Sequence, residues 1–211
     1  MLVKLFRCTV DHREAFARGQ AAWRGLVGLT GFIAQCGGWA RPGPDRAVIV
    51  GFWNDRASYD HFMAIDHDRI YADAAQSGTY HDPTAVLAGV VHPMPGSAEK
   101  FTDAVGRARL LRVADCRVRP GREAHFRDVQ RGVWLPGMRE VHGMLGGVFA
   151  RVLDDPLRYL VLTLWASEAD HDAYTRDRLG PLRERARPEA DVDALDGAGV
   201  RLEPAWCVVD M

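Results

Sequence analysis

Two glutamines, each set among aromatic residues at helical spacing, are the side chains with the clearest potential for chemistry. An amide on an apolar helix face must find hydrogen-bond partners, or its burial costs about 1–3 kcal/mol. Each glutamine could orient a ligand carbonyl or phenol, with a tryptophan as an aromatic wall; the alternative is that each amide bonds to neighbouring backbone. The two sets are Phe16, Gln20 and Trp23 in the first half and Phe126, Gln130 and Trp134 in the second.

His67 and Tyr71 stand four residues apart, which places them on one face of a helix if a helix continues through this segment. An imidazole beside a phenol at the mouth of a cavity can transfer protons near neutral pH. Leu179 stands near the equivalent of His67 in the second half, so such a site would exist once. The alternative is a solvated histidine, because the segment is rich in Asp. His61 is too poorly spaced from His67 for two metal ligands on one helix, so no metal site is predicted.

Two further pairs of residues occupy equivalent positions in the two halves. Trp53 and Trp165 each end a strand-like apolar run, and they can serve either as walls of a pocket or as anchors of the core. Lys4 and Arg112 would bind an anionic substrate or stabilise an enolate-like oxygen if they pointed inward. A buried charge needs a partner, so the alternative is that both side chains extend to the solvent at the rim.

These pairs belong to an internal duplication of the chain. A fixed offset between similar segments is typical of repeated structural units. The duplication predicts a first repeat over residues 1–92, a linker over 93–106 and a second repeat over 107–211. The segments that match are 7–16 with 115–126, 30–38 with 142–150, and 48–62 with 160–174.

The apolar periodicity within each copy predicts strand, helix, β-hairpin, helix and strand, in that order. This order is the ferredoxin-like βαββαβ unit. The elements predicted in the second copy are a strand at 108–118, a helix at 120–134, hairpin strands at 143–152 and 157–165, a helix at 167–177, a polar surface loop at 183–199 and a strand at 198–209.

A four-stranded sheet with helices on one face must bury its other face against something apolar. Val48, Val50 and Phe52 form a uniformly apolar face, which we expect to pack on the helices. Ile49 and Gly51 lie on the opposite face, where residues of mixed size leave room. We expect that face to meet its counterpart in the other copy and to enclose a cavity. The predicted fold class is α+β: two tandem ferredoxin-like repeats packed into one barrel within the chain.

Composition and charge exclude several classes of function. The chain has 27 basic and 28 acidic residues, so nothing indicates binding to nucleic acid. No apolar run reaches the ~18 residues of a membrane span, which predicts a cytoplasmic protein without membrane contact. The four cysteines lack metal-binding spacing and are expected to be buried thiols. Motifs of serine hydrolases, nucleotide-binding proteins and zinc proteases are missing from the sequence.

The segment PDRAVIVGFWNDRASYDHFM and its counterpart LRYLVLTLWASEADHDAYT carry a family resemblance. Their strand, tryptophan and capped helix resemble proteins of the antibiotic-biosynthesis-monooxygenase (ABM) type, in the dimeric α/β-barrel superfamily. The resemblance implies that two units, normally two subunits, are fused in tandem. The fused barrel would then be a monomeric pseudo-dimer or a homodimer of fused barrels.

The resemblance also implies a function: a cofactor-independent monooxygenase that acts with O₂ on an aromatic or polyketide-like small molecule. Two alternatives stay open, a non-catalytic protein that binds or senses a small ligand, and a haem-binding or haem-degrading protein. Related haem-degrading proteins use an Asn, a Trp and a His ligand, whereas here no His is equivalent in both halves. In the monooxygenase hypothesis His67 and Tyr71 move protons, and the substrate contacts Gln20, Trp23, Trp53, Gln130, Trp134 and Trp165.

Overall fold

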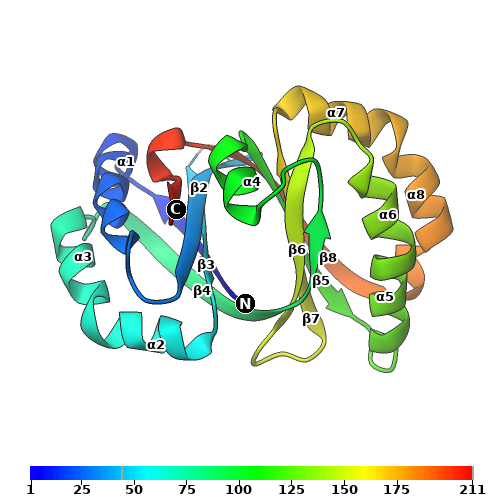
Figure 1. Ribbon diagram of the computed structural model, residues 1–211, viewed down its shortest axis with the longest axis horizontal. Coiled ribbons are helices and arrows are strands. Elements are labelled where there is room, and N and C mark those ends of the chain that lie inside the picture. Colours follow the sequence, from blue (N-terminus) through cyan, green and yellow to red (C-terminus); the bar gives the residue numbers. More distant parts are fainter. Residues whose placement is uncertain (44, 211) are drawn as a thin grey trace. The chain divides into compact units, whose positions relative to one another are not determined.

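The computed structural model describes residues 1–43 and 45–210. The chain divides into two compact units, one formed by Met1–Leu87 with Val200–Met211 and the other by Ala88–Gly199. Each unit has an antiparallel sheet with helices on one of its faces (Figure 1). The predicted α+β class with two tandem ferredoxin-like units is confirmed, and the packing of the two units into a barrel stays a prediction.

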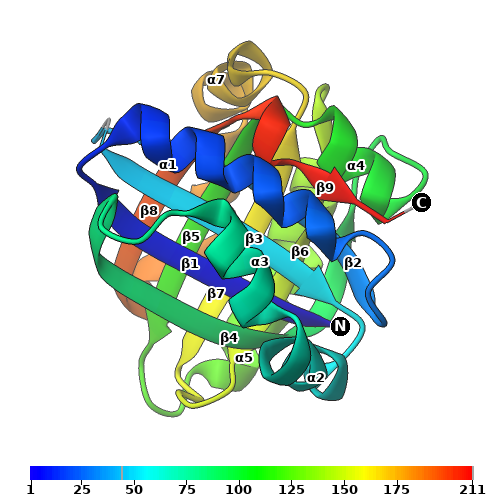
Figure 2. The ribbon, with the colours of Figure 1, turned by 90° about the vertical axis from the view of Figure 1, so that its left-hand side faces the viewer.

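The first unit contains the following elements: β1 (Leu2–Val10), α1 (Arg13–Gln20), the 3₁₀ helix η1 (Ala21–Leu26), β2 (Phe32–Arg41), β3 (Arg46–Trp53), α2 (Arg56–Ile65), α3 (His67–Ala74), the start of β4 (Tyr80–Pro95), the 3₁₀ helix η4 (Pro204–Trp206) and β9 (Val208–Val209). Its strands lie in the order β4, β1, β3, β2, with β9 beside β2. Figure 2 shows α1, α2 and α3 on one side of these strands.

The second unit repeats this order with β8, β5, β7 and β6, and the last part of β4 pairs with β6. The same path of the chain through the sheet supports the predicted duplication. The elements are α4 (Phe101–Arg107), β5 (Leu110–Val118), α5 (Glu123–Val129), the π-helical turn η2 (Gln130–Trp134), α6 (Leu135–Arg139), β6 (Met144–Val152), β7 (Arg158–Trp165), α7 (Glu168–Asp177), α8 (Leu179–Ala186), the 3₁₀ helix η3 (Pro188–Ala190) and β8 (Val192–Leu202).

The helix after each central strand begins at the same kind of cap in both units. Asp55 Oδ1 accepts a hydrogen bond from Ser58 N at 2.8 Å at the start of α2. Ser167 Oγ accepts one from Asp170 N at 3.1 Å at the start of α7. A side-chain oxygen at this position satisfies an amide that has no partner within the helix, which fixes where each helix begins.

Two predicted segments differ from the structure. The stretch 183–199, predicted as a loop, contains the end of α8 and most of β8. The stretch 93–106, predicted as a linker, contains the end of β4 and most of α4. β8 contains two aspartates and two glycines, residue types that disfavour strands, yet pairing beside β5 overrides this preference.

The prediction of which sheet face meets the helices was wrong. Trp53 at the end of β3 stacks on Phe62 of α2, with ring centroids 4.8 Å apart, and lies 5.9 Å from Tyr59. Because side chains alternate along a strand, Ile49 and Gly51 share this helix-covered face. Both faces of β3 are buried, so the pattern of apolar residues does not distinguish them.

Candidate functional site

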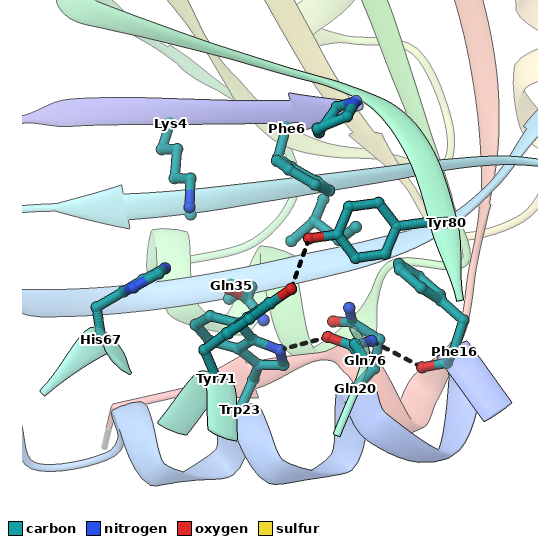
Figure 3. Close-up of a pocket in the computed structure, with 13 residues that line it drawn as sticks. Lys4, Phe6, Phe16, Gln20, Trp23, Gln35, His67, Tyr71, Gln76 and Tyr80 are labelled. Atoms are coloured by element: carbon teal, nitrogen blue, oxygen red, sulfur yellow. Dashed lines mark hydrogen bonds between the residues drawn. The ribbon is translucent and has the colours of Figure 1, made fainter. Parts of the chain in front are cut away.

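The first unit has a cavity of about 310 Å³ between its sheet and its helices, which is partly open to solvent (Figure 3). This volume lies within the range of small-molecule sites, which begins near ~300 Å³. The cavity therefore lies inside one repeat, on the face that we expected to meet the other copy. The lining residues are Lys4, Phe6, Phe16, Gln20, Trp23, Gln35, Ile49, Gly51, His67, Tyr71, Gln76, Tyr80 and Pro83.

Three neighbouring strands form the floor of the cavity. Lys4 of β1 is paired with Gly51 of β3, and Gly51 is paired with Gln35 of β2. Directly opposed residues of an antiparallel sheet point to the same face, so Lys4 and Gln35 stand on either side of the glycine. A Cβ at residue 51 would meet only Trp53 Nε1 within 4 Å, at 3.6 Å. The glycine thus leaves the space between the two polar side chains open.

The helices supply the opposite wall. Gln20 ends α1, Trp23 lies in η1, and His67 and Tyr71 lie one turn apart on α3. The ring of His67 lies 5.8 Å from that of Trp23 and 6.0 Å from that of Tyr71, to which it is nearly parallel. The structure thus places four residues of the sequence-based hypothesis around one cavity, though their roles stay predictions.

Gln76 holds this wall in place. Its Oε1 accepts a hydrogen bond from Trp23 Nε1 at 3.2 Å, and its Nε2 donates to the backbone oxygen of Phe16 at 2.8 Å. The side chain of Gln76 is buried, and a buried amide without hydrogen-bond partners would lower the stability of the fold. Both hydrogen bonds are therefore important for the stability of this wall. The indole of Trp23 is therefore fixed in position toward the cavity.

Two phenols meet at the side of the cavity. The hydroxyl groups of Tyr71 and Tyr80 lie 3.3 Å apart. Burial, followed by the hydrogen bond with Tyr71, raises the pKa of Tyr80 above its ordinary value. Tyr80 therefore remains a protonated phenol under physiological conditions, able to donate or accept a hydrogen bond.

Two buried amide atoms of the lining have no hydrogen-bond partner among the described residues. They are Oε1 of Gln20, on the helical wall, and Nε2 of Gln35, on the floor. Both side chains are more than nine-tenths buried, at 4% and 7% exposure. Buried polar groups are nearly always bonded, so an acceptor and a donor without partners, on two side chains that line a cavity, are candidates for binding a polar ligand. Between aromatic walls, they would fix its orientation.

The charged and titratable side chains of the cavity lining include a lysine and a histidine but no carboxylate among the described residues. Lys4 is half-buried, with Nζ 5.7 Å from the centroid of the Phe6 ring, and burial lowers the pKa of its ammonium group. His67 bonds through Nδ1 to the exposed carboxylate of Asp68, at 2.9 Å. No Asp or Glu is found among the described residues that line the cavity. The lining therefore favours a neutral or anionic ligand over a cation.

The other predicted binding residues lie outside this cavity. Trp53 is a core residue of the first unit that packs on α2. Trp165 is fully buried in the second unit, where its Nε1 donates to Thr163 Oγ1 at 2.9 Å. Gln130 is buried there as well, and Trp134 packs against an apolar cluster. Of the two glutamine sets named from the sequence, only the first lines the described cavity.

The second unit carries different residues at the positions of the floor. Thr163 replaces the glycine and is paired with Arg112 and Gly147. The guanidinium of Arg112 donates to the backbone oxygens of Val113 and Ala198. Leu179, at the position of His67, packs against the apolar cluster of this unit. At these positions the second unit thus keeps a cation but has no counterpart of Gln35, Gly51 or His67.

Sequence reasoning did not single out the lining residues Gln35, Gln76 and Tyr80. Gln35 offered a signal, because an amide within an otherwise apolar strand is unusual. Gly51 was expected on a face that leaves room, and a glycine in the interior of a strand often marks a close approach to a ligand. Gln76 and Tyr80 follow α3 in a segment without periodicity, and only the folded chain brings them to the cavity.

The described residues contain no group of three His, Cys, Asp or Glu side chains placed to hold a metal ion. All four cysteines are free thiols: Cys8, Cys36 and Cys116 are buried and Cys207 is half-buried. Burial raises the pKa of Cys8 to about 12, which makes it a poor nucleophile. None of the described helices is long and apolar enough to cross a membrane.

Haem fits the cavity poorly. A volume of about 310 Å³ lies at the lower end of the range for drug-sized ligands, and a porphyrin macrocycle is larger than such ligands. His67 is the one imidazole among the described lining residues, and its ring packs near Trp23 and Tyr71. These residues therefore do not favour haem as a resident cofactor.

A ferredoxin-like sheet with a cavity beneath its helices defines the first unit as an α+β protein with space for a small molecule. Residues 109–178 match the family model "Antibiotic biosynthesis monooxygenase", and residues 2–86 match "Domain of unknown function (DUF4937)". The second half of the chain thus contains an antibiotic biosynthesis monooxygenase domain, and the first half contains a DUF4937 domain. The family resemblance of the sequence is thereby confirmed.

One curated protein and two solved structures are similar to this chain. "Uncharacterized protein YdbC" from Bacillus subtilis (strain 168) is 44% identical over 80 residues, which cover 36% of this chain and 67% of YdbC. The structure of a "putative monooxygenase" from Lactobacillus acidophilus NCFM superposes with a TM-score of 0.74 at 11% identity, over 99% of this chain and 95% of that one. An "anthrone oxidase-like protein" gives 0.67 at 15% identity, over 96% and 91%. At these identities the two structures show the shared fold.

Proposed function

We propose that the cavity of the first unit binds a planar aromatic or polyketide-like molecule and promotes its oxidation by O₂ without a bound cofactor. The observation that carries this proposal is the pair of buried amide atoms without partners, Gln20 Oε1 and Gln35 Nε2, in a cavity walled by aromatic rings. Such a site favours a flat ring system with a hydroxyl group for the acceptor and a carbonyl or ionised oxygen for the donor. The match of residues 109–178, in the second unit, to the antibiotic biosynthesis monooxygenase model and the structural likeness of the chain to an "anthrone oxidase-like protein" are in keeping with it.

The chemistry suited to such a ligand is oxidation of a methylene group activated by phenol rings. The methylene carbon loses both hydrogens and gains one atom of O₂ as a carbonyl oxygen, while the other atom leaves as water with those hydrogens. The substrate supplies the electrons, so the protein has to bind the ring, accept a proton from it and exclude solvent. The product is a quinone-like ketone.

The lining residues have distinct roles in this proposal. Gln20 and Gln35 orient the oxygens of the ring system, and Trp23 stacks beside it. His67 accepts the first proton, since an imidazole is the side chain best suited to proton transfer near neutral pH. Tyr71 lies one turn from His67 on α3, and its hydroxyl is hydrogen-bonded to that of Tyr80, so the two phenols are placed to exchange protons with the ligand at the side of the cavity.

The proposal is tested with 1,8-dihydroxyanthrone as probe, in the full-length protein. Oxygen uptake and the visible absorption of the quinone report turnover above the rate of oxidation in air without protein. Carrying out the reaction in ¹⁸O₂ should place one labelled atom in the product. We expect Gln20→Ala and His67→Ala each to reduce turnover by about tenfold or more, in line with the loss of a positioned polar or proton-transfer group.

The duplication provides matched controls. Gln130→Ala and Trp134→Phe change the equivalent residues of the second unit and should leave turnover within about twofold of the unaltered protein, provided that the fold is retained by circular dichroism. If Gln20→Ala and His67→Ala both leave turnover unchanged, the assigned roles are wrong. Tight binding of the probe without oxidation in air would instead support a non-catalytic binding or sensing protein. A Soret band on titration with haem that disappears in His67→Ala would support the haem alternative.

A further inference from the structure

A row of residues across the cavity floor indicates the charge of the ligand. Lys4, Gly51 and Gln35, here called the strand row, are paired in register on three adjacent strands. Neighbouring strands lie about 4.8 Å apart, so the two polar side chains flank a gap of about two strand spacings above the glycine. Figure 3 shows the Lys4 side chain extending from its strand into the cavity that Gln35 also lines.

Both polar members of the strand row present hydrogen-bond donors. The ammonium group of Lys4 has donors only, and Gln35 Nε2 is a buried donor that no described residue accepts. No ion pair to Lys4 is formed by the carboxylates in the described part of the chain, and the lining contains none. The other titratable groups around the cavity are His67, Tyr71 and Tyr80, none of which supplies a carboxylate. A ligand with a negatively charged oxygen for Lys4 and a further acceptor for Gln35 would satisfy both donors.

The second unit shows what the same three positions look like without such a site. Arg112, Thr163 and Gly147 form the equivalent row. There the cation is bonded to backbone oxygens, and the threonine hydroxyl accepts from Trp165 Nε1. The donors of the first row thus belong to side chains that line a cavity, whereas the cation and hydroxyl of the second row are bonded within the protein.

We infer that the strand row binds an anionic oxygen of the aromatic ligand, so that the ligand class is aromatic molecules carrying an ionised phenol, enol or carboxylate. This inference rests on the proposed function only in that the ligand is aromatic and uses the same cavity. The lowered pKa of Lys4 agrees with it, because an ammonium group that loses solvation on burial gains most from an anionic partner. Ligand binding should therefore return the pKa of Lys4 toward its ordinary value.

The first experiment uses 4-nitrophenol, whose ionised form has its own absorption band. Addition of the full-length protein at a pH below the pKa of the free phenol should increase this band as the bound phenol ionises. Lys4→Met should weaken binding of the phenolate by about tenfold to a hundredfold, the usual loss for a hydrogen bond to a charged group. Lys4→Arg should retain most of the effect. Lys100→Met is the matched control, because Lys4 and Lys100 are the two lysines of the chain and Lys100 is exposed.

A second experiment reads Lys4 directly and separates carboxylates from phenols. In protein labelled with ¹³C at lysine Cε, the two lysine signals are assigned with Lys100→Met. The carboxylate 1-naphthoate should shift the Lys4 signal and raise its pKa, while the neutral 1-naphthamide should bind more weakly and leave that pKa unchanged. A response to 4-nitrophenol but not to 1-naphthoate would restrict the ligand class to phenols and enols.

The outcomes separate this inference from the proposed function. If naphthoate and naphthamide bind equally well and the Lys4 signal does not respond, the strand row binds no anion. The proposal that the cavity binds aromatic molecules would then be retained. If the anion preference is found but 1,8-dihydroxyanthrone is not oxidised, the proposed oxidation is refuted. The inference that the strand row binds an anionic oxygen would then be retained. If no aromatic probe binds at millimolar concentration, both are refuted.

Discussion

The substitution Gly51→Thr gives the first unit the residue that the second unit has at the equivalent position, Thr163. The structure predicts that this change stabilises the fold and abolishes ligand binding. A glycine inside a strand costs about 0.5–1 kcal/mol relative to alanine, and threonine is a good strand former. The introduced Cβ would lie 3.6 Å from Trp53 Nε1, an ordinary contact, so no clash opposes the gain.

The introduced hydroxyl should also bond to an indole. In the second unit Thr163 Oγ1 accepts from Trp165 Nε1 at 2.9 Å, and Trp53 holds the equivalent position beside Gly51. A hydrogen bond of this kind contributes about 1 kcal/mol. Together the two effects amount to about 1–2 kcal/mol, which for a chain of 211 residues raises Tm by about 2–8 °C.

Thermal unfolding followed by circular dichroism measures the gain, and calorimetry with 1-naphthoate measures binding. The side chain would occupy the gap between Lys4 and Gln35, so affinity should fall by at least about tenfold. Gly89→Thr, in a strand segment of the second unit, is the control for strand propensity and should leave binding unchanged. A lower Tm for Gly51→Thr would show that the floor is not open, and unchanged affinity would show that the ligand does not reach it.

Three further predictions concern the cavity wall and the packing of each unit. Trp23→Phe, which removes the indole donor, should lower stability by about 1 kcal/mol and weaken binding of 1-naphthamide, whereas Trp134→Phe should leave that binding unchanged. Asp191→Ala should destabilise the fold by about 3 kcal/mol in urea unfolding, because a fully buried carboxylate bonded to an arginine and a histidine is lost; a change below about 1 kcal/mol would contradict this. The hydrogen bond with Asp11 raises the pKa of His81, so its contribution to stability is present at low pH and is lost as pH rises through that pKa; NMR titration of Asp11→Asn should show a lower pKa for His81.

The order of strands and helices could be predicted from sequence because the two copies support each other. A weak strand signal in one half gains weight when the same pattern recurs about 110 residues later. Where the copies differ, the prediction failed. The segment 183–199 has no similar counterpart in the first half, and its short polar residues concealed β8, whose pairing depends on distant residues.

Part of the site was also accessible from sequence. Gln20 and Trp23 share a helical face, as do His67 and Tyr71, and local spacing alone brings each pair to one surface. The location of the cavity was not accessible, because β3 is apolar on both faces and the choice between them depends on tertiary packing. For the same reason Gln35, paired across strands with Gly51, was not recognised as part of the site.

A duplicated fold allows one copy to lose stability for the sake of a site while the other stays closely packed. In the first unit an interior glycine, a half-buried lysine and two amide atoms without partners each lower stability, and all of them belong to residues that line the same cavity. At the equivalent positions the second unit has a threonine bonded to a tryptophan, an arginine bonded to backbone, and a leucine in an apolar cluster. Unfavourable features gathered in one place are typical of a functional site, because such features are retained where a ligand needs them. The contrast between the two units therefore supports a ligand site in the first more strongly than the family resemblance does, since both halves share the fold.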